Sequence, residues 1–353
     1  MTSECDDGAA RPIILSAVDK FRGTATSREL GRIIESSISS QDLLGDIQSM
    51  SDGGEGFLDV FDGEVVAVEA PGPLLTPVIA RVKIVRSTSG TLGVVEVSDV
   101  VGRDLLPAPS DREALAASSD GVGYLILAAA NHGVDEVLVG CGGTATSDGG
   151  LGCYRVLVAA GGLPVPVTAA TDVTASFSGA RRYALQKGVS PNDLVVVDER
   201  LRKVRAQYLE ERSVDVESVE RSGAAGGIPG ALAALGARLT SGFDAVTRSV
   251  DLATRVTRSS MVVTGEGRFD GGSLEGKVTV GMAELVHDRL PLLVVCGSLD
   301  QAAARTFRQR FTTAMLVSLE ERFGRERAFG DVLACVDSVV RDELQRHFSS
   351  CST

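Results

Sequence analysis

Apolar residues are arranged in two ways along the chain, and each arrangement predicts a different element. Short, mainly apolar segments, typical of buried strands, occupy residues 12–18, 134–140, 260–263 and 292–295. Segments expected to be helical occupy residues 26–37, 121–132, 151–160, 277–287 and 331–347. The first helix is predicted to begin after Thr26, because Glu29 follows three residues later and completes a capping box. Alternation of strand and helix at both chain ends predicts a parallel sheet.

The middle of the chain has a different pattern. Residues 64–69, 78–85 and 91–97 alternate apolar and polar positions, as antiparallel strands with one exposed face do. Further strands are expected at residues 46–50, 168–173, 193–197 and 311–319, and a charged surface helix at residues 201–218. The glycine- and alanine-rich residues 223–236 suit either close helix packing or contact with a ligand.

A length of 353 residues fits two domains. We predict an α/β protein in which residues 11–62 and 262–350 form one parallel-sheet domain, and residues 63–261 form a second α/β domain inserted between its two parts. Residues 1–10 are acidic and polar and are expected to be a disordered tail. Aromatic residues make up 4% of the chain and Trp is absent, so small aliphatic side chains must fill the interior, which favours α/β layers.

Three Asp-Gly-Gly tripeptides begin at Asp52, Asp148 and Asp270, each within or beside a longer glycine-rich turn. Glycine allows close backbone approach to a ligand, and successive N–H groups in such turns form anion-binding concavities. The neighbouring carboxylates repel a phosphate unless a divalent cation lies between them. A single Asp-Gly would be ordinary turn chemistry, but three such tripeptides, two of them preceded by Ser, predict a site for a metal and a polyphosphate.

The charge and the rarer residues exclude several functions. A formal net charge of −12 argues against a nucleic-acid partner. The few cations near the glycine turns must therefore act locally, and they are Lys20, Arg22, Lys187, Arg268 and Lys277. Six cysteines and three histidines form no zinc-binding spacing. The N-terminal residues lack an apolar signal region and no apolar run is long enough to span a bilayer, so a cytoplasmic protein without a membrane partner is expected.

Two segments have the residue types that phosphoryl chemistry uses. In residues 265–270 (GEGRFD), Glu266 and Asp270 are suited to hold Mg²⁺ or to accept a hydroxyl proton, and Arg268 is suited to clamp an anion. A salt-bridged turn is the alternative interpretation of this segment. Residues 271–278 nearly match a Walker motif, but Val278 stands where the hydroxyl belongs, which leaves Lys277 as either a phosphate ligand or a surface residue.

The ordered motifs resemble those of the type I glycerate kinases, the bacterial glycerate 2-kinase family, from about residue 13 to residue 347. Residues 17–24 are similar to A-P-D-S-F-K-G-S, and residues 52–56 reproduce D-G-G-E-G. Residues 142–152 are similar to G-G-S-A-T-N-D-G-G-x-G. The Q-K-G, G-A-A-G-G and G-E-G-R-x-D motifs stand at residues 186–188, 223–227 and 265–270. The chain departs from the family at residues 172–176, where D-V-x-N-P has lost its Asn and Pro, and in a shorter middle segment.

The resemblance implies ATP-dependent phosphorylation of D-glycerate to 2-phosphoglycerate with Mg²⁺. It also implies that the domain built from both chain ends is flavodoxin-like and that the site lies in the cleft between the domains. The residues expected to carry catalysis are Asp270, Glu266, Arg268 and Lys277. Substrate binding is expected from Arg22, Lys20, Asp52, Glu55 and Asp172, and metal binding from Asp52, Asp148 and Asp270. Nucleotide binding is expected from Gly142, Gly143, Thr144, Thr146, Ser147 and Lys187.

Two alternatives stay open at this point. The shortened middle segment is compatible with a kinase for another small hydroxy acid. The altered motif at residues 172–176 is compatible with a nucleotide-binding relative that has no catalytic activity. The sequence makes no prediction of the oligomeric state.

Overall fold

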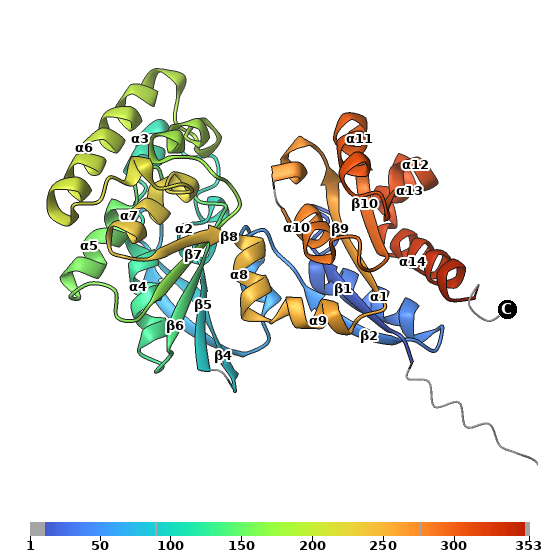
Figure 1. Ribbon diagram of the computed structural model, residues 1–353. Helices are drawn as coiled ribbons and strands as arrows, with labels where there is room; N and C mark the ends of the chain where they lie inside the picture. The colour runs from blue at the N-terminus through green and yellow to red at the C-terminus, as the bar shows by residue number, and fades with distance from the viewer. Residues whose placement is uncertain (1–10, 89, 276, 350–353) are drawn as a thin grey trace, which may run out of the picture. The chain divides into compact units, whose positions relative to one another are not determined.

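The computed structural model describes residues 11–88, 90–275 and 277–349 (Figure 1). The predicted tail at residues 1–10 lies outside this part of the chain. The protein forms two compact units: unit 1 comprises the residues up to Ser51 and those from Thr247 onward, and unit 2 comprises Asp52–Val246. The sequence analysis placed the corresponding boundaries at residues 62/63 and 261/262.

Unit 1 contains a five-stranded parallel sheet with the order β11-β10-β9-β1-β2. Its strands are β1 (Ile13–Val18), β2 (Leu44–Ser49), β9 (Met261–Phe269), β10 (Leu292–Leu299) and β11 (Ala314–Ser318). Numbered within the unit, this order is the 2-1-3-4-5 arrangement of flavodoxin-like folds. The predicted parallel sheet is therefore confirmed.

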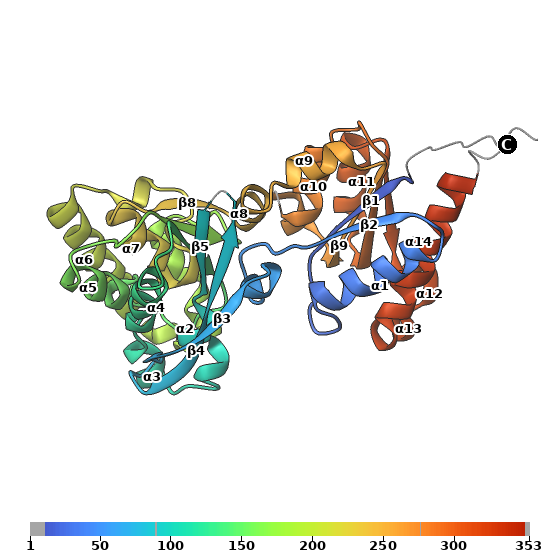
Figure 2. The same cartoon turned by 90° about the horizontal axis from the view of Figure 1, so that it is seen from below.

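Helices cover both faces of this sheet (Figure 2). One face carries α1 (Ser27–Ser39), α12 (Leu319–Phe323), α13 (Arg325–Gly330) and α14 (Val332–Ser349). The other carries α9 (Leu252–Arg258), α10 (Val278–Val286) and α11 (Gln301–Arg310). Buried side chains of α1 and α14, such as Ile34 and Val339, pack on Ile14 and Val263 of the central strands. The predicted capping box is present, since the Thr26 side chain accepts a hydrogen bond from Glu29 N.

Unit 2 contains a six-stranded mixed sheet with the order β3-β4-β5-β6-β7-β8. The strands are β3 (Glu64–Pro71), β4 (Pro77–Ser87), β5 (Gly90–Glu96), β6 (Glu136–Cys141), β7 (Val167–Thr171) and β8 (Arg238–Ser241). The strands β3, β4 and β5 pair antiparallel, as their alternation predicts, and β5 to β8 pair parallel. The short strand β8 was not predicted.

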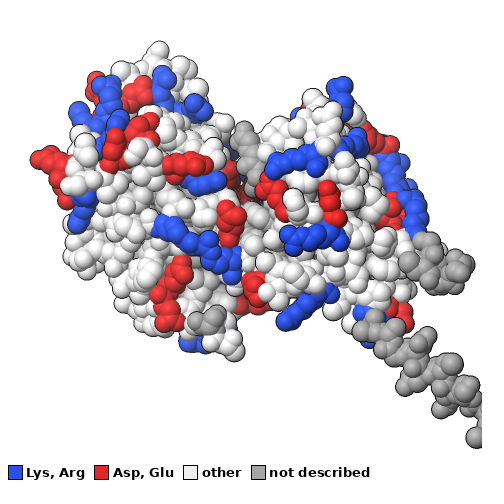
Figure 3. All heavy atoms as spheres, in the orientation of Figure 1, with Lys and Arg blue, Asp and Glu red and all other residues white. Residues whose placement is uncertain are grey.

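Two cores stabilise unit 2. The first packs α4 (Asp120–Ala130) against the sheet, and the second surrounds Tyr154 and Tyr208. The remaining helices are α2 (Ser98–Val101), α3 (Asp111–Ala116), α5 (Leu151–Ala159), α6 (Leu194–Arg212), α7 (Ile228–Ala234) and α8 (Gly242–Ser249). On the face in Figure 3, basic and acidic side chains are interspersed rather than gathered into one patch. Within the described ranges, every helix is too short or too polar to cross a membrane.

The strand predicted at residues 193–197 is wrong, because these residues lie at the start of helix α6. Three β-branched valines favoured the strand prediction. The Ser190 side chain accepts a hydrogen bond from Asp193 N and Pro191 stands in the first turn, which are signals of a helix start. The buried residues Val197 and Leu201 then follow helical spacing.

The turn at residues 52–56 belongs to unit 2 because glycines hold it against two strand ends. A Cβ at Gly242, after β8, would lie 1.9 Å from the carbonyl carbon of Asp52. A Cβ at Gly142, after β6, would lie 2.5 Å from the Cα of Gly54. Any side chain at these positions would push the turn away from the sheet.

We therefore expect Gly242→Ala to destabilise the protein by about 1–3 kcal/mol, the usual cost of overpacking. Gly330→Ala is the matched control, because nothing lies within 4 Å of a Cβ there. Urea unfolding followed by circular dichroism measures both variants. Equal unfolding midpoints for the two variants would contradict the close packing of this turn.

Candidate active site

In unit 1, the neighbouring strands β1 and β9 are followed by helices on opposite faces of the sheet (Figure 2). Ligands of open parallel sheets bind at the carboxyl ends of strands at such a switch point. Residues 19–22 follow β1, and residues 265–269 end β9. Gly267 brings the two segments together, because a Cβ there would lie 3.0 Å from Arg22 N. This edge therefore gathers the predicted residues Lys20, Arg22, Glu266, Arg268 and Asp270.

Glu266 has the chemistry of a general base. Its carboxylate is buried, and Oε2 accepts a hydrogen bond of 2.8 Å from Ser273 Oγ. Oε1 has no hydrogen-bond partner within the described part of the chain, and neither does the buried Thr279 Oγ1. Burial raises the pKa of Glu266 to about 7, and the hydrogen bond from Ser273 and the charge of Lys277 act against this rise. Such a group accepts a proton near neutral pH.

Asp270 and Arg268 form an exposed ion pair at 3.4 Å beside this carboxylate. Ser273, which the sequence analysis missed, connects the two acids: it accepts from Asp270 N at 3.1 Å and donates to Glu266. Exposed ion pairs of this kind contribute about 0–1 kcal/mol. The Arg268 guanidinium can therefore exchange its partner for an anionic ligand. Lys277 precedes α10 in the same unit, and Gly276 lies outside the described residues.

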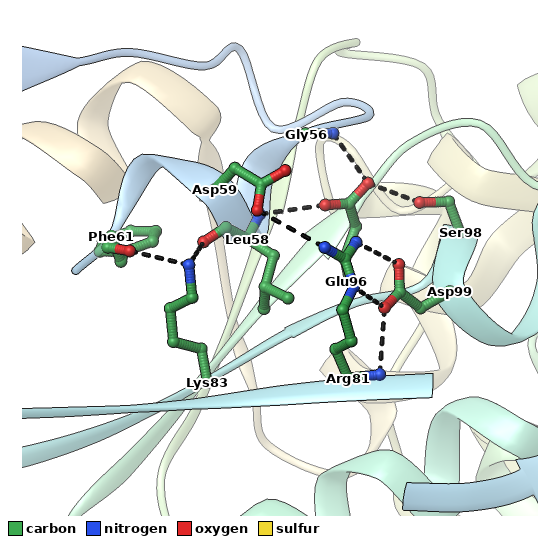
Figure 4. A network of polar contacts seen from close by, with 9 residues as sticks. All are labelled: Gly56, Leu58, Asp59, Phe61, Arg81, Lys83, Glu96, Ser98 and Asp99. Atoms are coloured by element: carbon green, nitrogen blue, oxygen red, sulfur yellow. Dashed lines mark hydrogen bonds and ion pairs between the residues drawn. The ribbon is translucent and has the colours of Figure 1, made fainter. Parts of the chain in front are cut away.

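In unit 2, the turn at residues 52–56 is fixed by a buried carboxylate at the end of β5 (Figure 4). Glu96 accepts hydrogen bonds from Gly56 N at 2.9 Å, Leu58 N at 3.0 Å and Ser98 Oγ at 2.5 Å. Burial raises its pKa, and these hydrogen bonds oppose the rise. Sequence reasoning missed Glu96, although an acid that ends an apolar strand is a signal for such an anchor.

Asp148 holds the glycine loop of residues 142–152 in place. Its carboxylate accepts hydrogen bonds from Ser119 N, Ser119 Oγ, Gly150 N and Gly152 N at 2.7–3.1 Å. These donors show a role in positioning the loop, and its contact with a metal stays a prediction. Of the other predicted metal ligands, Asp52 lies in unit 2 and Asp270 in unit 1. Nowhere in residues 11–88, 90–275 and 277–349 do three His, Cys, Asp or Glu side chains form a group suited to a metal.

Lys187 is buried beneath the same loop. Its Nζ donates to Thr144 Oγ1 at 3.0 Å and to Thr146 O at 2.6 Å. Burial lowers its pKa to about 7; the charge of Asp148 raises it and that of Arg103 lowers it further. Two buried hydroxyl oxygens of the loop, Thr146 Oγ1 and Ser147 Oγ, have no hydrogen-bond partner among the described residues. The loop therefore offers several polar groups to a ligand.

The remaining predicted residues of unit 2 also follow its strands. Asp172 comes directly after β7. The turn that contains Asp52 and Glu55 packs near Ala170 in the same strand: a Cβ at Gly53 would lie 3.1 Å from the carbonyl oxygen of Ala170. A cavity of about 370 Å³ lies beside the glycine loop and is lined by Arg103 and Lys187 among others. The sequence analysis missed Arg103. Its place beside the glycine loop follows from the pairing of its neighbour Gly102 with Thr144, which only the fold reveals.

Comparisons with known proteins identify the family of this chain. The sequence pattern of the glycerate kinase family matches residues 14–161 and 163–337. Glycerate 2-kinase of Escherichia coli (strain K12) is 31% identical over 329 residues, which cover 81% of this chain and 85% of the relative. An uncharacterised protein of Mycobacterium tuberculosis (strain CDC 1551 / Oshkosh) is 35% identical over 311 residues, which cover 83% and 78%.

A solved structure shows the same fold. The crystal structure of a proposed glycerate kinase 2 from Salmonella typhimurium LT2 aligns with a TM-score of 0.78 at 24% identity, over 97% of this chain and 100% of that chain. The family match extends over nearly the whole chain and includes both units. The chain therefore belongs to the glycerate kinase family and is a phosphotransferase that acts on a small molecule.

Proposed function

We propose that this protein transfers the terminal phosphoryl group of ATP to D-glycerate in the presence of Mg²⁺ and forms 2-phosphoglycerate. Membership of the glycerate kinase family and the similarity to the E. coli glycerate 2-kinase support the reaction. The observation that carries the proposal is the buried Glu266 carboxylate, which has one unsatisfied oxygen at the switch point of a flavodoxin-like sheet.

The glycine loop of unit 2 fits a polyphosphate. The buried hydroxyls of Thr146 and Ser147 are without partners in the described structure, as expected of groups that await ligand oxygens. In its charged form, Lys187 Nζ carries three hydrogens and uses two of them within the protein, which leaves one for a phosphate oxygen. We assign the phosphates of ATP to these groups.

The Asp carboxylates of the glycine turns fit Mg²⁺ that is bound together with a nucleotide. Mg²⁺ is usually held by one or two carboxylates and by substrate phosphates rather than by a protein cage. Either Asp270 of unit 1 or Asp52 of unit 2, both partly exposed turn residues, would hold it. When bound, Mg²⁺ offsets the negative charge that develops on the transferred group.

The residues of unit 1 position and deprotonate the acceptor. In this proposal, Arg268 or Arg22 holds the carboxylate of the acid, and Glu266 accepts the proton of its C2 hydroxyl. The hydroxyl oxygen forms a bond to phosphorus while the bond from phosphorus to the ADP oxygen breaks. The proton remains on Glu266 until it passes to solvent.

The direct test is an assay of the purified protein with ATP, Mg²⁺ and D-glycerate, in which nuclear magnetic resonance identifies the product. We expect 2-phosphoglycerate. Formation of 3-phosphoglycerate would overturn the proposed position of transfer. A faster reaction with another small hydroxy acid would overturn the proposed substrate.

Glu266→Gln should lower kcat/KM by about 10²–10⁴-fold, the usual contribution of a general base. Because the pKa of Glu266 is about 7, wild-type kcat/KM for D-glycerate, measured at saturating ATP so that Lys187 is already charged, should rise as pH increases through 7 and then level off. The variant should lack this rise. Glu326→Gln, an exposed position on α13, is the control and should keep the wild-type profile.

A stability measurement separates this loss from structural damage. The raised pKa means that the folded state binds the proton of Glu266 more tightly than the unfolded chain does. Wild-type stability therefore falls as pH rises from the ordinary pKa of Glu toward 7. Gln carries no charge, so the variant should have the higher Tm at pH 8. A lower Tm at that pH would contradict the burial of an ionised carboxylate.

A further prediction concerns Lys187, because a nearby phosphate favours the charged form of its amine. At pH 8 the amine is mostly neutral, since its pKa is about 7. ATP binding should then be accompanied by proton uptake, measured by calorimetry in buffers of different ionisation enthalpy. Lys187→Met should abolish this uptake, whereas Lys203→Met, at an exposed position of α6, should preserve it. Unchanged uptake in Lys187→Met would exclude Lys187 as the responsive group.

A further inference from the structure

The cavity of about 370 Å³ in unit 2 is lined by apolar residues on two sides and by charged and amide side chains elsewhere. One wall consists of the segment after α2, with Leu106, Pro107 and Pro109, and the other contains Leu185. A Cβ at Gly188 would lie 2.6 Å from Pro109 Cγ, so close packing holds the two walls together. Leu185 is 49% exposed and is therefore accessible to a ligand in the cavity.

The polar groups of the cavity lie where it adjoins the glycine loop. Arg103 N donates to Gly143 O at 3.1 Å, and Ala145 N donates to Val101 O at 2.7 Å, so the loop is joined to the first wall. The cations Arg103 and Lys187 line this region. Asp104 and Gln186 also line the cavity and add a carboxylate and an amide.

We propose that this cavity binds the base and ribose of a nucleoside di- or triphosphate, an inference that rests on the proposed kinase function. The volume lies in the usual range of small-molecule sites, about 300–1,000 Å³, and a three-carbon acid would leave most of it empty. The apolar side chains on its two sides, Leu106, Pro109 and Leu185, suit the faces of a nucleobase. The Gln186 amide can both donate to and accept from a base edge.

The charged residues of the cavity agree with a nucleotide whose base and ribose lie in the cavity and whose phosphates lie at the glycine loop. A carboxylate such as Asp104 accepts hydrogen bonds from ribose hydroxyls but repels phosphate, so it suits the middle of a nucleotide rather than a simple anion. Arg103 and Lys187 lead from the cavity to the glycine loop, to which the phosphates are assigned above. Leu185 and Gln186 are therefore assigned as determinants of nucleotide selectivity.

The experiment compares the binding of ADP and of tripolyphosphate, which has no base, by calorimetry. Leu185→Asn replaces an apolar side chain that lines the cavity with a neutral polar side chain of similar size. Leu209→Asn is the matched control, because Leu209 is also 49% exposed in unit 2 and does not line the cavity. Both positions are half exposed, so neither change should impair folding, and Tm values check this.

We expect Leu185→Asn to weaken ADP binding about fivefold and to leave tripolyphosphate binding unchanged. Arg103→Met should weaken both ligands. Equal ADP affinity in wild type, Leu185→Asn and Leu209→Asn would overturn the inference. If the wild-type protein phosphorylates D-glycerate while the cavity variants bind ADP normally, the inference is overturned and the proposed function is not. Selective loss of ADP binding in a protein that does not phosphorylate D-glycerate would support the inference and refute the proposed function.

Discussion

Close approach of glycine backbones at the carboxyl ends of the strands is the constraint on which the candidate site residues of each unit depend. In unit 2, a Cβ at Gly226 would lie 2.1 Å from Thr146 O, which carries a hydrogen bond of Lys187. In unit 1, a Cβ at Gly297 would lie 2.5 Å from Gly267 O, next to Glu266. Without these glycines the turns would separate, water would enter, and the ionisable groups would lose the burial that shifts their pKa values.

Burial shifts an acid and an amine toward the same pH from opposite directions. It raises the pKa of Glu266 in unit 1 and lowers the pKa of Lys187 in unit 2, each to about 7. Desolvation disfavours the charged form in both cases, so one physical cause yields a base that can be protonated and an amine that can be neutral near neutral pH. In the reaction proposed above, Glu266 would accept the hydroxyl proton and Lys187 would become charged as phosphate binds.

The sequence predicts those parts of the fold and site that depend on short-range pattern. Apolar runs and glycine turns located the parallel strands and the loops at their ends. The strand expected at residues 193–197 was wrong because propensity outweighed the capping signal before it. The assignment of residues 52–56 to unit 2 could not be predicted from local pattern, because it depends on packing against Gly142 and Gly242, far along the chain. Glu96 and Arg103 were missed for the same reason, since their partners lie about 40 residues away. Ser273 has partners only three and seven residues away, but which acids it connects depends on the fold of the turn.

The departures from the family motifs lie in unit 2 and act on the glycine loop indirectly. The altered segment at residues 172–176 is held by Gly223, whose N–H donates to Ala175 O at 3.0 Å and whose Cβ, if present, would lie 1.9 Å from Ser176 O. The same glycine-rich segment continues to Gly226, which contacts the loop above Lys187. The lost Asn and Pro therefore alter a support of this loop, whereas both hydrogen bonds of Lys187 remain. The contacts of Glu266 described here are all within unit 1, so its surroundings do not depend on that segment.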